Sequence, residues 1–182
     1  MIPSLKSDYL KYKKYGGNFF TILFFTQGFW AIFQYRFART IYQSKLPQVL
    51  KRIILLICLI WQKGIEILTG ISIPFSVQIG HSFYIGHFCN IILNSNSIIG
   101  NNCNISQGVT LGVSGQGEKR GVPILGDNVY VGANAVIAGK VKIGDNVIIV
   151  ANSLVNKSIP NNSIAIGVPA KVVKEIDKNN YI

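Results

Sequence analysis

The fold of this chain is decided by a repeat that is clearest in residues 125–155, LGDNVYVGANAVIAGKVKIGDNVIIVANSLV, where an aliphatic residue returns at every sixth position. The same period extends back to residue 73. A fixed short period of this kind is typical of a parallel β-helix, in which each six-residue unit supplies one strand and one turn and three units close a triangular coil. The inward-pointing aliphatic residues form three runs: Ile73, Ile79, Ile85 and Ile91; Ile99, Ile105 and Leu111; and Leu125, Val131, Ile137, Ile143, Ile149 and Val155.

The residues that follow the aliphatic positions favour tight turns. Asparagine recurs there, as in Gly126-Asp127-Asn128, and glycine and asparagine reach left-handed backbone conformations at the lowest cost. A meandering sheet also repeats at a multiple of two residues, but thirteen aliphatic positions in three phased runs favour the β-helix. A glycine directly follows the aliphatic position in seven units, at Gly80, Gly86, Gly100, Gly112, Gly126, Gly132 and Gly144.

The repeat is interrupted twice. Between Ile91 and Ile99 the spacing is eight residues, so we expect one turn there to bulge by two residues. Residues 112–123, GVSGQGEKRGVP, form a polar, glycine-rich excursion. Loops inserted into repeat scaffolds usually lie on the binding face, so we expect this loop to line a site.

Helical patterns precede the repeat. Residues 3–15 have a loosely helical pattern that ends at Gly16-Gly17, residues 19–43 predict a helix, and residues 48–68 predict another. The last is apolar almost all round over residues 53–61, which indicates burial or lipid contact. We therefore expect a helical region that covers the first coil of the β-helix. The predicted domains are residues 1–70 for this region, 71–173 for the β-helix with its loop at 112–123, and 174–182 for a tail.

The net charge of +11 is concentrated near the start of the chain. Residues 1–70 carry ten lysines and arginines against Asp8 and Glu66. This basic, aromatic-rich segment suits an anionic membrane surface or an acidic acceptor, and a merely solvated face is the alternative. Nucleic acid is not expected as a partner, because no recognised binding motif accompanies the charge.

Targeting signals are not evident in the sequence. The first residues are polar and basic, and the longest uninterrupted apolar run, residues 53–61, is nine residues against the roughly 20 that span a bilayer. The three cysteines, Cys58, Cys89 and Cys103, have no paired spacing, so we expect reduced thiols and a cytoplasmic protein, with peripheral contact at the inner membrane face left open. Cys89 and Cys103 lie within the repeat and are expected to be buried.

Histidine is a natural general base near neutral pH, because its ordinary pKa is near 6.5. The chain contains His81 and His87, and their spacing of six places them on adjacent faces of the prism. Two histidines on different faces do not form a three-histidine zinc site, so no metal is expected.

Several motifs together resemble the serine acetyltransferases of the hexapeptide-repeat family. They are the aliphatic repeat, the eight-residue step, SQGVTLG at 106–112, the loop, GVPA at 167–170, and GFWAIFQYR at 28–36, which is similar to the helix preceding the repeat in that family. The resemblance covers about residues 26–173. It implies a left-handed β-helix, a homotrimer or a dimer of trimers joined through the helices, acetyl-CoA as donor, and an active site between subunits.

The resemblance also suggests roles for particular residues. His87 lies where the family carries its catalytic histidine, and Ala133 and Ala151 lie where small residues let the pantetheine arm pass. Gly112 and Gly115 open the loop near the thioester, where backbone N–H groups stabilise a developing oxyanion. Lys171 would meet a phosphate of coenzyme A. Each of the donor residues also has a purely structural interpretation in a tight coil.

The acceptor side departs from the family pattern at three positions. Ser72 stands in place of the aspartate that orients the catalytic histidine, an acidic residue is missing near Gly17, and Val122 replaces a loop histidine, with Arg120 nearby as a substrate-binding candidate. The partner of His87 is left open among Asp8, Glu66, Glu118 and a backbone carbonyl.

We therefore expect an acetyl-CoA-dependent O-acetyltransferase. These departures favour a saccharide hydroxyl of surface polysaccharide, free or lipid-linked, as acceptor. Serine O-acetyltransferase of cysteine biosynthesis is the first alternative, and a non-catalytic assembly module is the second.

Overall fold

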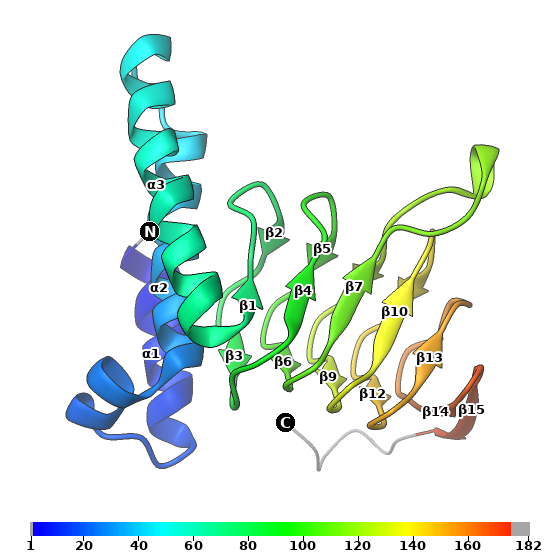
Figure 1. Cartoon of the computed structure of the whole chain (residues 1–182). Helices are drawn as coiled ribbons and strands as arrows, with labels where there is room; N and C mark the ends of the chain where they lie inside the picture. Colours follow the sequence, from blue (N-terminus) through cyan, green and yellow to red (C-terminus); the bar gives the residue numbers. More distant parts are fainter. Residues whose placement is uncertain (1, 176–182) are drawn as a thin grey trace.

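The computed structural model of the chain describes residues 2–175. Three helices, α1 (Ile2–Lys14), α2 (Gln27–Gln43) and α3 (Gln48–Thr69), stand at one end of a prism of short strands (Figure 1). The helix predicted over residues 48–68 is confirmed. The continuous helix predicted over 19–43 is wrong, because a short π-helix, η1 (Thr21–Phe25), is separated from α2 by extended backbone at Thr26.

The prism is a left-handed parallel β-helix, as predicted. Successive strands enter three sheets in rotation, and all pairs are parallel except the final hairpin of β14 and β15. Sheet A contains β1 (Ile71–Ser72), β4 (Ile91–Leu93), β7 (Thr110–Gly112), β10 (Val136–Ala138) and β13 (Leu154–Val155); sheet B contains β2 (Gln78–Ile79), β5 (Ile98–Ile99), β8 (Ile124–Leu125) and β11 (Lys142–Ile143); sheet C contains β3 (Tyr84–Ile85), β6 (Asn104–Ile105), β9 (Tyr130–Val131), β12 (Ile148–Ile149), β14 (Ser163–Gly167) and β15 (Ala170–Glu175).

The aliphatic repeat fills the interior of the prism. In sheet B, for example, Ile79, Ile99, Leu125 and Ile143 are in register on adjacent strands and are all buried. At the corner between sheets B and C, the turns place asparagines in the left-handed conformation, and each Nδ2 donates to the next Oδ1 at 2.8–2.9 Å. These asparagines are Asn102, Asn128, Asn146 and Asn162. The sequence pattern therefore specifies both the core and the turns.

The two extra residues are not where the sequence spacing placed them. Ile85 pairs with Ile105 and Ile92 pairs with Thr110. To pass from sheet C to sheet A, the chain therefore uses seven residues on the first coil and five on the second. Leu93, rather than Ile91, is in register with Leu111 of the core. The bulge predicted between Ile91 and Ile99 therefore lies before Ile91, and it was misplaced because both Ile91 and Leu93 are buried.

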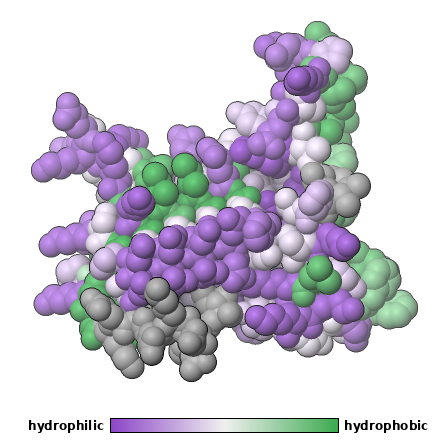
Figure 2. All heavy atoms as spheres, turned by 180° about the vertical axis from the view of Figure 1, so that it is seen from behind, coloured by the Kyte–Doolittle hydropathy of each residue, from purple (hydrophilic) through white to green (hydrophobic). Residues whose placement is uncertain are grey.

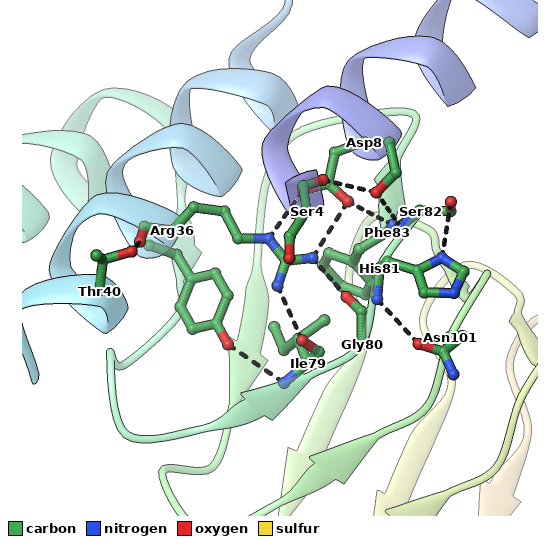
Figure 3. A network of polar contacts seen from close by, with 12 residues as sticks. Ser4, Asp8, Arg36, Thr40, Ile79, Gly80, His81, Ser82, Phe83 and Asn101 are labelled. Atoms are coloured by element: carbon green, nitrogen blue, oxygen red, sulfur yellow. Dashed lines mark hydrogen bonds and ion pairs between the residues drawn. The ribbon is translucent and has the colours of Figure 1, made fainter. Parts of the chain in front are cut away.

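The helices cover the first coil, as predicted. The hydroxyl of Tyr12 in α1 donates to the Ile85 carbonyl at 2.8 Å, and that of Tyr35 in α2 donates to the Val77 carbonyl at 2.9 Å. Figure 3 shows a buried ion pair beside these contacts, in which Arg36 Nε lies 2.8 Å from Asp8 Oδ2.

Both members of that ion pair also hold the backbone of the first coil. Arg36 donates to the carbonyls of Ile79 and Gly80, and Asp8 Oδ1 accepts a 2.8 Å bond from the Phe83 N–H. The network fixes α1 and α2 to the turn between β2 and β3 (Figure 3). The helical region and the prism therefore share one core.

Candidate functional site

His87 and Phe88 are the two extra residues of the first coil. In the turns that follow β3 and β6, Gly108 N–H donates to the Cys89 carbonyl, and Asn90 and Gly108 both adopt positive φ. The first and second coils are therefore in register again from Cys89 onward. The two residues between Gly86 and Cys89 therefore have no counterpart on the next coil. Both are exposed, and the bulge displays the imidazole at the corner between sheets C and A.

The end of α3 holds this bulge from behind. Cys89 N–H donates to the Thr69 carbonyl at 2.8 Å, and Ile91 N–H donates to the Gly70 carbonyl at 2.9 Å. Gly70 has φ of +66°, and a Cβ there would lie 2.9 Å from the Asn90 nitrogen, so only glycine fits. Cys89 is exposed with φ of +93°, which corrects the prediction that it is buried, whereas Cys103 is buried as predicted.

The acids left open as partners of His87 lie in three different environments. Asp8 is occupied by Arg36 and the Phe83 N–H, inside the helix–prism contact. Glu118 lies in the exposed loop, in the 3₁₀-helix η2 (Gly117–Lys119). Glu66 lies in the last turn of α3, where its Oε1 accepts a 2.7 Å hydrogen bond from the Ser72 hydroxyl. Glu66 is thus the acid closest in the fold to the segment that holds the bulge.

The carboxylate of Glu66 is set up to stay ionised. Burial raises its pKa, but hydrogen bonds from Lys63, Ser72 and Gln62 outweigh this effect and hold the pKa below its ordinary value. Within the described part of the chain, the His87 side chain has no hydrogen-bond partner of its own.

Ala133 and Ala151 lie on the same edge of the prism as His87. The Asn134 N–H donates to the Gln107 carbonyl and the Asn152 N–H donates to the Ala133 carbonyl, so residues 89, 107, 133 and 151 stack along the corner between sheets C and A. Both alanines have small side chains, and they follow the His87 bulge along this edge. The structure therefore aligns the predicted base with two of the predicted donor positions.

The inserted loop lies on the other edge of sheet A. Gly112 ends β7, and a bridge between Ser114 and Gly121 closes the loop that carries Gly115 and exposed Arg120. Gly115 has φ of +94° and packs directly against the Lys119 carbonyl, so it also requires glycine. His87 precedes β4, and the loop follows β7, the strand next to β4 in sheet A. His87 and the loop therefore lie at opposite ends of these two strands, and one chain does not bring them together.

Two further candidates lie away from His87. Lys171 is exposed on β15, in the last coil of the prism, where it pairs with Ile166. His81 occupies a different corner, where its Nδ1 lies 3.1 Å from the Ser82 hydroxyl and its backbone N–H donates to Asn101 Oδ1 (Figure 3). The predicted separation of the two histidines is confirmed. Within residues 2–175, no three histidine, cysteine or acidic side chains are grouped as metal ligands would be.

Sequence reasoning missed the Glu66–Ser72 contact and the position of the bulge. The six-residue separation of Glu66 and Ser72 spans a helix end and a strand, so no single periodicity links them. The bulge had a signal, because an aliphatic ladder through Leu93 in place of Ile91 restores a six-residue step to Ile99.

Residues 123–157 match the family model described as bacterial transferase hexapeptide (six repeats). The chain is 33% identical over 156 residues to the serine acetyltransferase of Synechococcus elongatus, an alignment covering 86% of this chain and 61% of that protein. It thus spans less than two thirds of the length of that curated relative.

Two solved structures of serine acetyltransferases are also similar to this chain. The Neisseria gonorrhoeae serine acetyltransferase in complex with serine is 30% identical, with a TM-score of 0.79, over 94% of this chain and 68% of that one. A serine acetyltransferase in complex with CoA is 28% identical, with a TM-score of 0.79, over 94% of this chain and 69% of that one.

Proposed function

The chain belongs to the serine acetyltransferase-like family of hexapeptide-repeat proteins, and we propose that it is an acetyl-CoA-dependent O-acetyltransferase with His87 as its general base. One observation carries this proposal. His87 is displayed from a two-residue bulge that interrupts an otherwise regular coil, and the end of α3 fixes the backbone of that bulge.

The proposed reaction is a direct transfer. The His87 imidazole takes the proton of the acceptor hydroxyl as its oxygen attacks the thioester carbonyl. The tetrahedral oxyanion is stabilised by backbone N–H groups near Gly112 and Gly115. When the carbon–sulfur bond breaks, the imidazolium returns the proton to the departing thiolate, so the products are the acetyl ester and free coenzyme A.

The site needs a second subunit. Since His87 and the loop lie on opposite edges of sheet A, a loop from a neighbouring chain must supply the groups that one chain cannot bring to His87. We therefore propose a trimer in which Gly112, Gly115 and Arg120 of one subunit face His87 of the next. Such a head-to-tail interface is heterologous, and three copies of it close into a ring with cyclic symmetry.

The donor is proposed to lie along the edge that follows His87. Ala133 and Ala151 leave room for the pantetheine arm, and Lys171 at the far end of the prism supplies a positive charge for phosphate. The solved relative in complex with CoA supports acetyl-CoA as the donor.

L-Serine is now the better-supported acceptor. The relatives are named serine acetyltransferases, and one solved relative is in complex with serine. An argument against serine is also weaker, because the Glu66 carboxylate reaches Ser72, the position where the family resemblance implies an aspartate. The saccharide hydroxyl expected from the sequence becomes the second candidate. Val122 in the loop and the lack of an acid near Gly17 still favour it.

The proposal is tested by the release of coenzyme A from acetyl-CoA, with L-serine and then with nucleotide-linked sugars. His87→Ala should lower kcat by about 10²–10⁴-fold, whereas His81→Ala, a histidine on another corner, should leave it unchanged. Serine-dependent turnover supports the first acceptor, and sugar-dependent turnover with serine inert supports the second. Turnover that survives His87→Ala would overturn the assignment of the base.

A further inference from the structure

Five large apolar side chains project from the segment between α1 and α2. We call residues 19–25 the phenylalanine hook. Figure 2 shows apolar atoms projecting at the lower right, at the helical end of the molecule. Contiguous apolar surface of this kind marks an interaction site. The exposed side chains are Phe19 (56%), Phe20 (68%), Leu23 (39%), Phe24 (55%) and Phe25 (74%).

The hook is anchored, so its exposure is a property of the fold. Ile22 turns inward and is 1% exposed, while Trp30 Nε1 donates a 2.7 Å bond to the Leu23 carbonyl. Asn18 and Thr21 exchange two further hydrogen bonds, of 3.0 and 2.9 Å, at its start. The phenylalanines therefore cannot turn inward without breaking the contacts that hold the hook in place against α2.

An apolar groove of about 390 Å³ opens beside the hook. Phe19, Leu23 and Phe33 form part of its wall, and Lys6 stands at its rim. A groove with apolar walls and one cationic rim matches a fatty acyl chain attached to an anionic headgroup.

The charges around the hook have one sign. Lys6, Lys13 and Lys14 are exposed on α1, whereas the two acids of residues 1–70 are occupied internally, Asp8 by Arg36 and Glu66 by Ser72 and Lys63. A second copy of this surface would bring like charges together. An anionic lipid surface is attracted to these lysines instead.

We propose that the phenylalanine hook, its groove and the α1 lysines form a docking surface for an anionic phospholipid bilayer. The phenylalanines enter the boundary between headgroups and acyl chains, and the lysines contact the lipid phosphates. No helix among the described residues is long and apolar enough to cross a membrane. This inference does not depend on the acceptor.

The test is flotation of the full chain with vesicles of phosphatidylcholine alone or mixed with phosphatidylglycerol. We expect the wild type to float only with the anionic vesicles, and less so as salt is raised. Phe24→Ser/Phe25→Ser and Lys13→Ser/Lys14→Ser should each weaken binding by about tenfold or more. Leu56→Ser, which removes an equally exposed apolar side chain from α3, is the matched control and should bind as the wild type does.

Thermal unfolding of each variant in the absence of lipid should match the wild type, which separates loss of docking from loss of folding. A wild type that ignores anionic vesicles overturns the proposal, and so do hook variants that still float. If the hook variants instead reduce the mass of the assembly in light scattering, while lipid has no effect, the hook is an interface between copies.

Discussion

The hydroxyl of Ser72 donates a 2.7 Å hydrogen bond to Oε1 of Glu66, which joins the first strand of the prism to the last turn of α3. The same turn ends at Thr69 and Gly70, whose carbonyls accept the backbone N–H groups of Cys89 and Ile91. A carboxylate and the proposed general base are therefore positioned by one helix end. Because Glu66 and Ser72 have no counterpart in any single repeat unit, this arrangement belongs to the junction between helix and prism.

Glu66 is predicted to assist His87 as a positioning residue. Glu66→Gln should lower kcat by about tenfold or more with little change in KM, because loss of the negative charge weakens support for the imidazolium. Ser72→Asp, which places a carboxylate on the strand, should restore part of the activity in the Glu66→Gln background. Lys63→Met, which changes only the exposed partner of Glu66, should have a small effect on kcat. An unchanged kcat in Glu66→Gln would exclude the role.

Glu66 should also contribute to acid stability. Its folded-state pKa lies below the ordinary value, so its stabilising contribution is present at neutral pH and is lost as pH falls through the folded-state pKa. Chemical unfolding followed from pH 7 down to pH 3 should therefore show a shallower loss of stability for Glu66→Gln than for the wild type. Parallel curves would contradict this prediction.

Gly70→Ala tests the support of the bulge. The substitution places a side chain at φ of +66° and 2.9 Å from the Asn90 nitrogen, which should cost about 1–3 kcal/mol of unfolding free energy. Because the His87 backbone must then move, kcat should fall while the variant is still folded. Gly64→Ala, at an exposed site in the same helix where a Cβ meets nothing within 4 Å, is the control and should be neutral or stabilising.

The buried pair of Asp8 and Arg36 should couple the helices to the prism. Removing one partner leaves an uncompensated buried charge, so Asp8→Asn or Arg36→Met should each lower the free energy of unfolding by about 3–5 kcal/mol. The double variant should lose less than the sum of the two single losses, because no lone charge remains. Urea unfolding of the four proteins measures the coupling, and additive losses would contradict it.

Lys11 is predicted to make stability rise with pH in the mildly alkaline range. Burial lowers its pKa to about 8, and Nζ has no hydrogen-bond partner among the described residues. Between about pH 8 and its ordinary pKa near 10.5, the unfolded chain binds more protons than the folded chain, so the folded state gains stability. Cys103 acts in the opposite direction. Burial raises the pKa of its thiol to about 11, so above about pH 9 the unfolded chain loses the thiol proton more readily than the folded chain, and the folded state loses stability.

The difference between the wild type and Lys11→Met isolates the lysine. At pH 7 the variant should be the more stable protein, and the difference should shrink as pH rises from 8 to 10. Lys13→Met, on the exposed side of α1, should show no such trend. A pH-independent difference would mean that Lys11 keeps its ordinary pKa.

Subunit mixing tests whether the site lies between chains. His87→Ala and Gly115→Val are each predicted to lower activity strongly, the first by removing the base and the second by forcing a side chain into a position that requires glycine. In randomly mixed trimers, about a quarter of the interfaces would join an intact His87 to an intact loop, so refolding the two variants together should recover activity to that extent. No recovery would place the complete site within one chain.

The sequence by itself determined the β-helix, its buried aliphatic ladder, the asparagine turns and the inserted loop. A six-residue period is a local property, and each unit places its own side chain inside or its own turn outside, so reading the units in order was enough. The repeat contains both His81 and His87, and the resemblance to the serine acetyltransferases is what singled out His87 as the candidate base.

Only the tertiary structure decided how the region around His87 is built. Ile91 and Leu93 are both buried, so hydrophobicity alone could not say which one continues the ladder, and the pairing of Ile92 with Thr110 moved the extra residues to His87 and Phe88. The contact of Glu66 with Ser72 was equally inaccessible to periodicity, since it depends on the angle at which a helix meets a coil. Side-chain burial is encoded locally, whereas register and the meeting of two kinds of element are fixed by packing between segments distant in the chain.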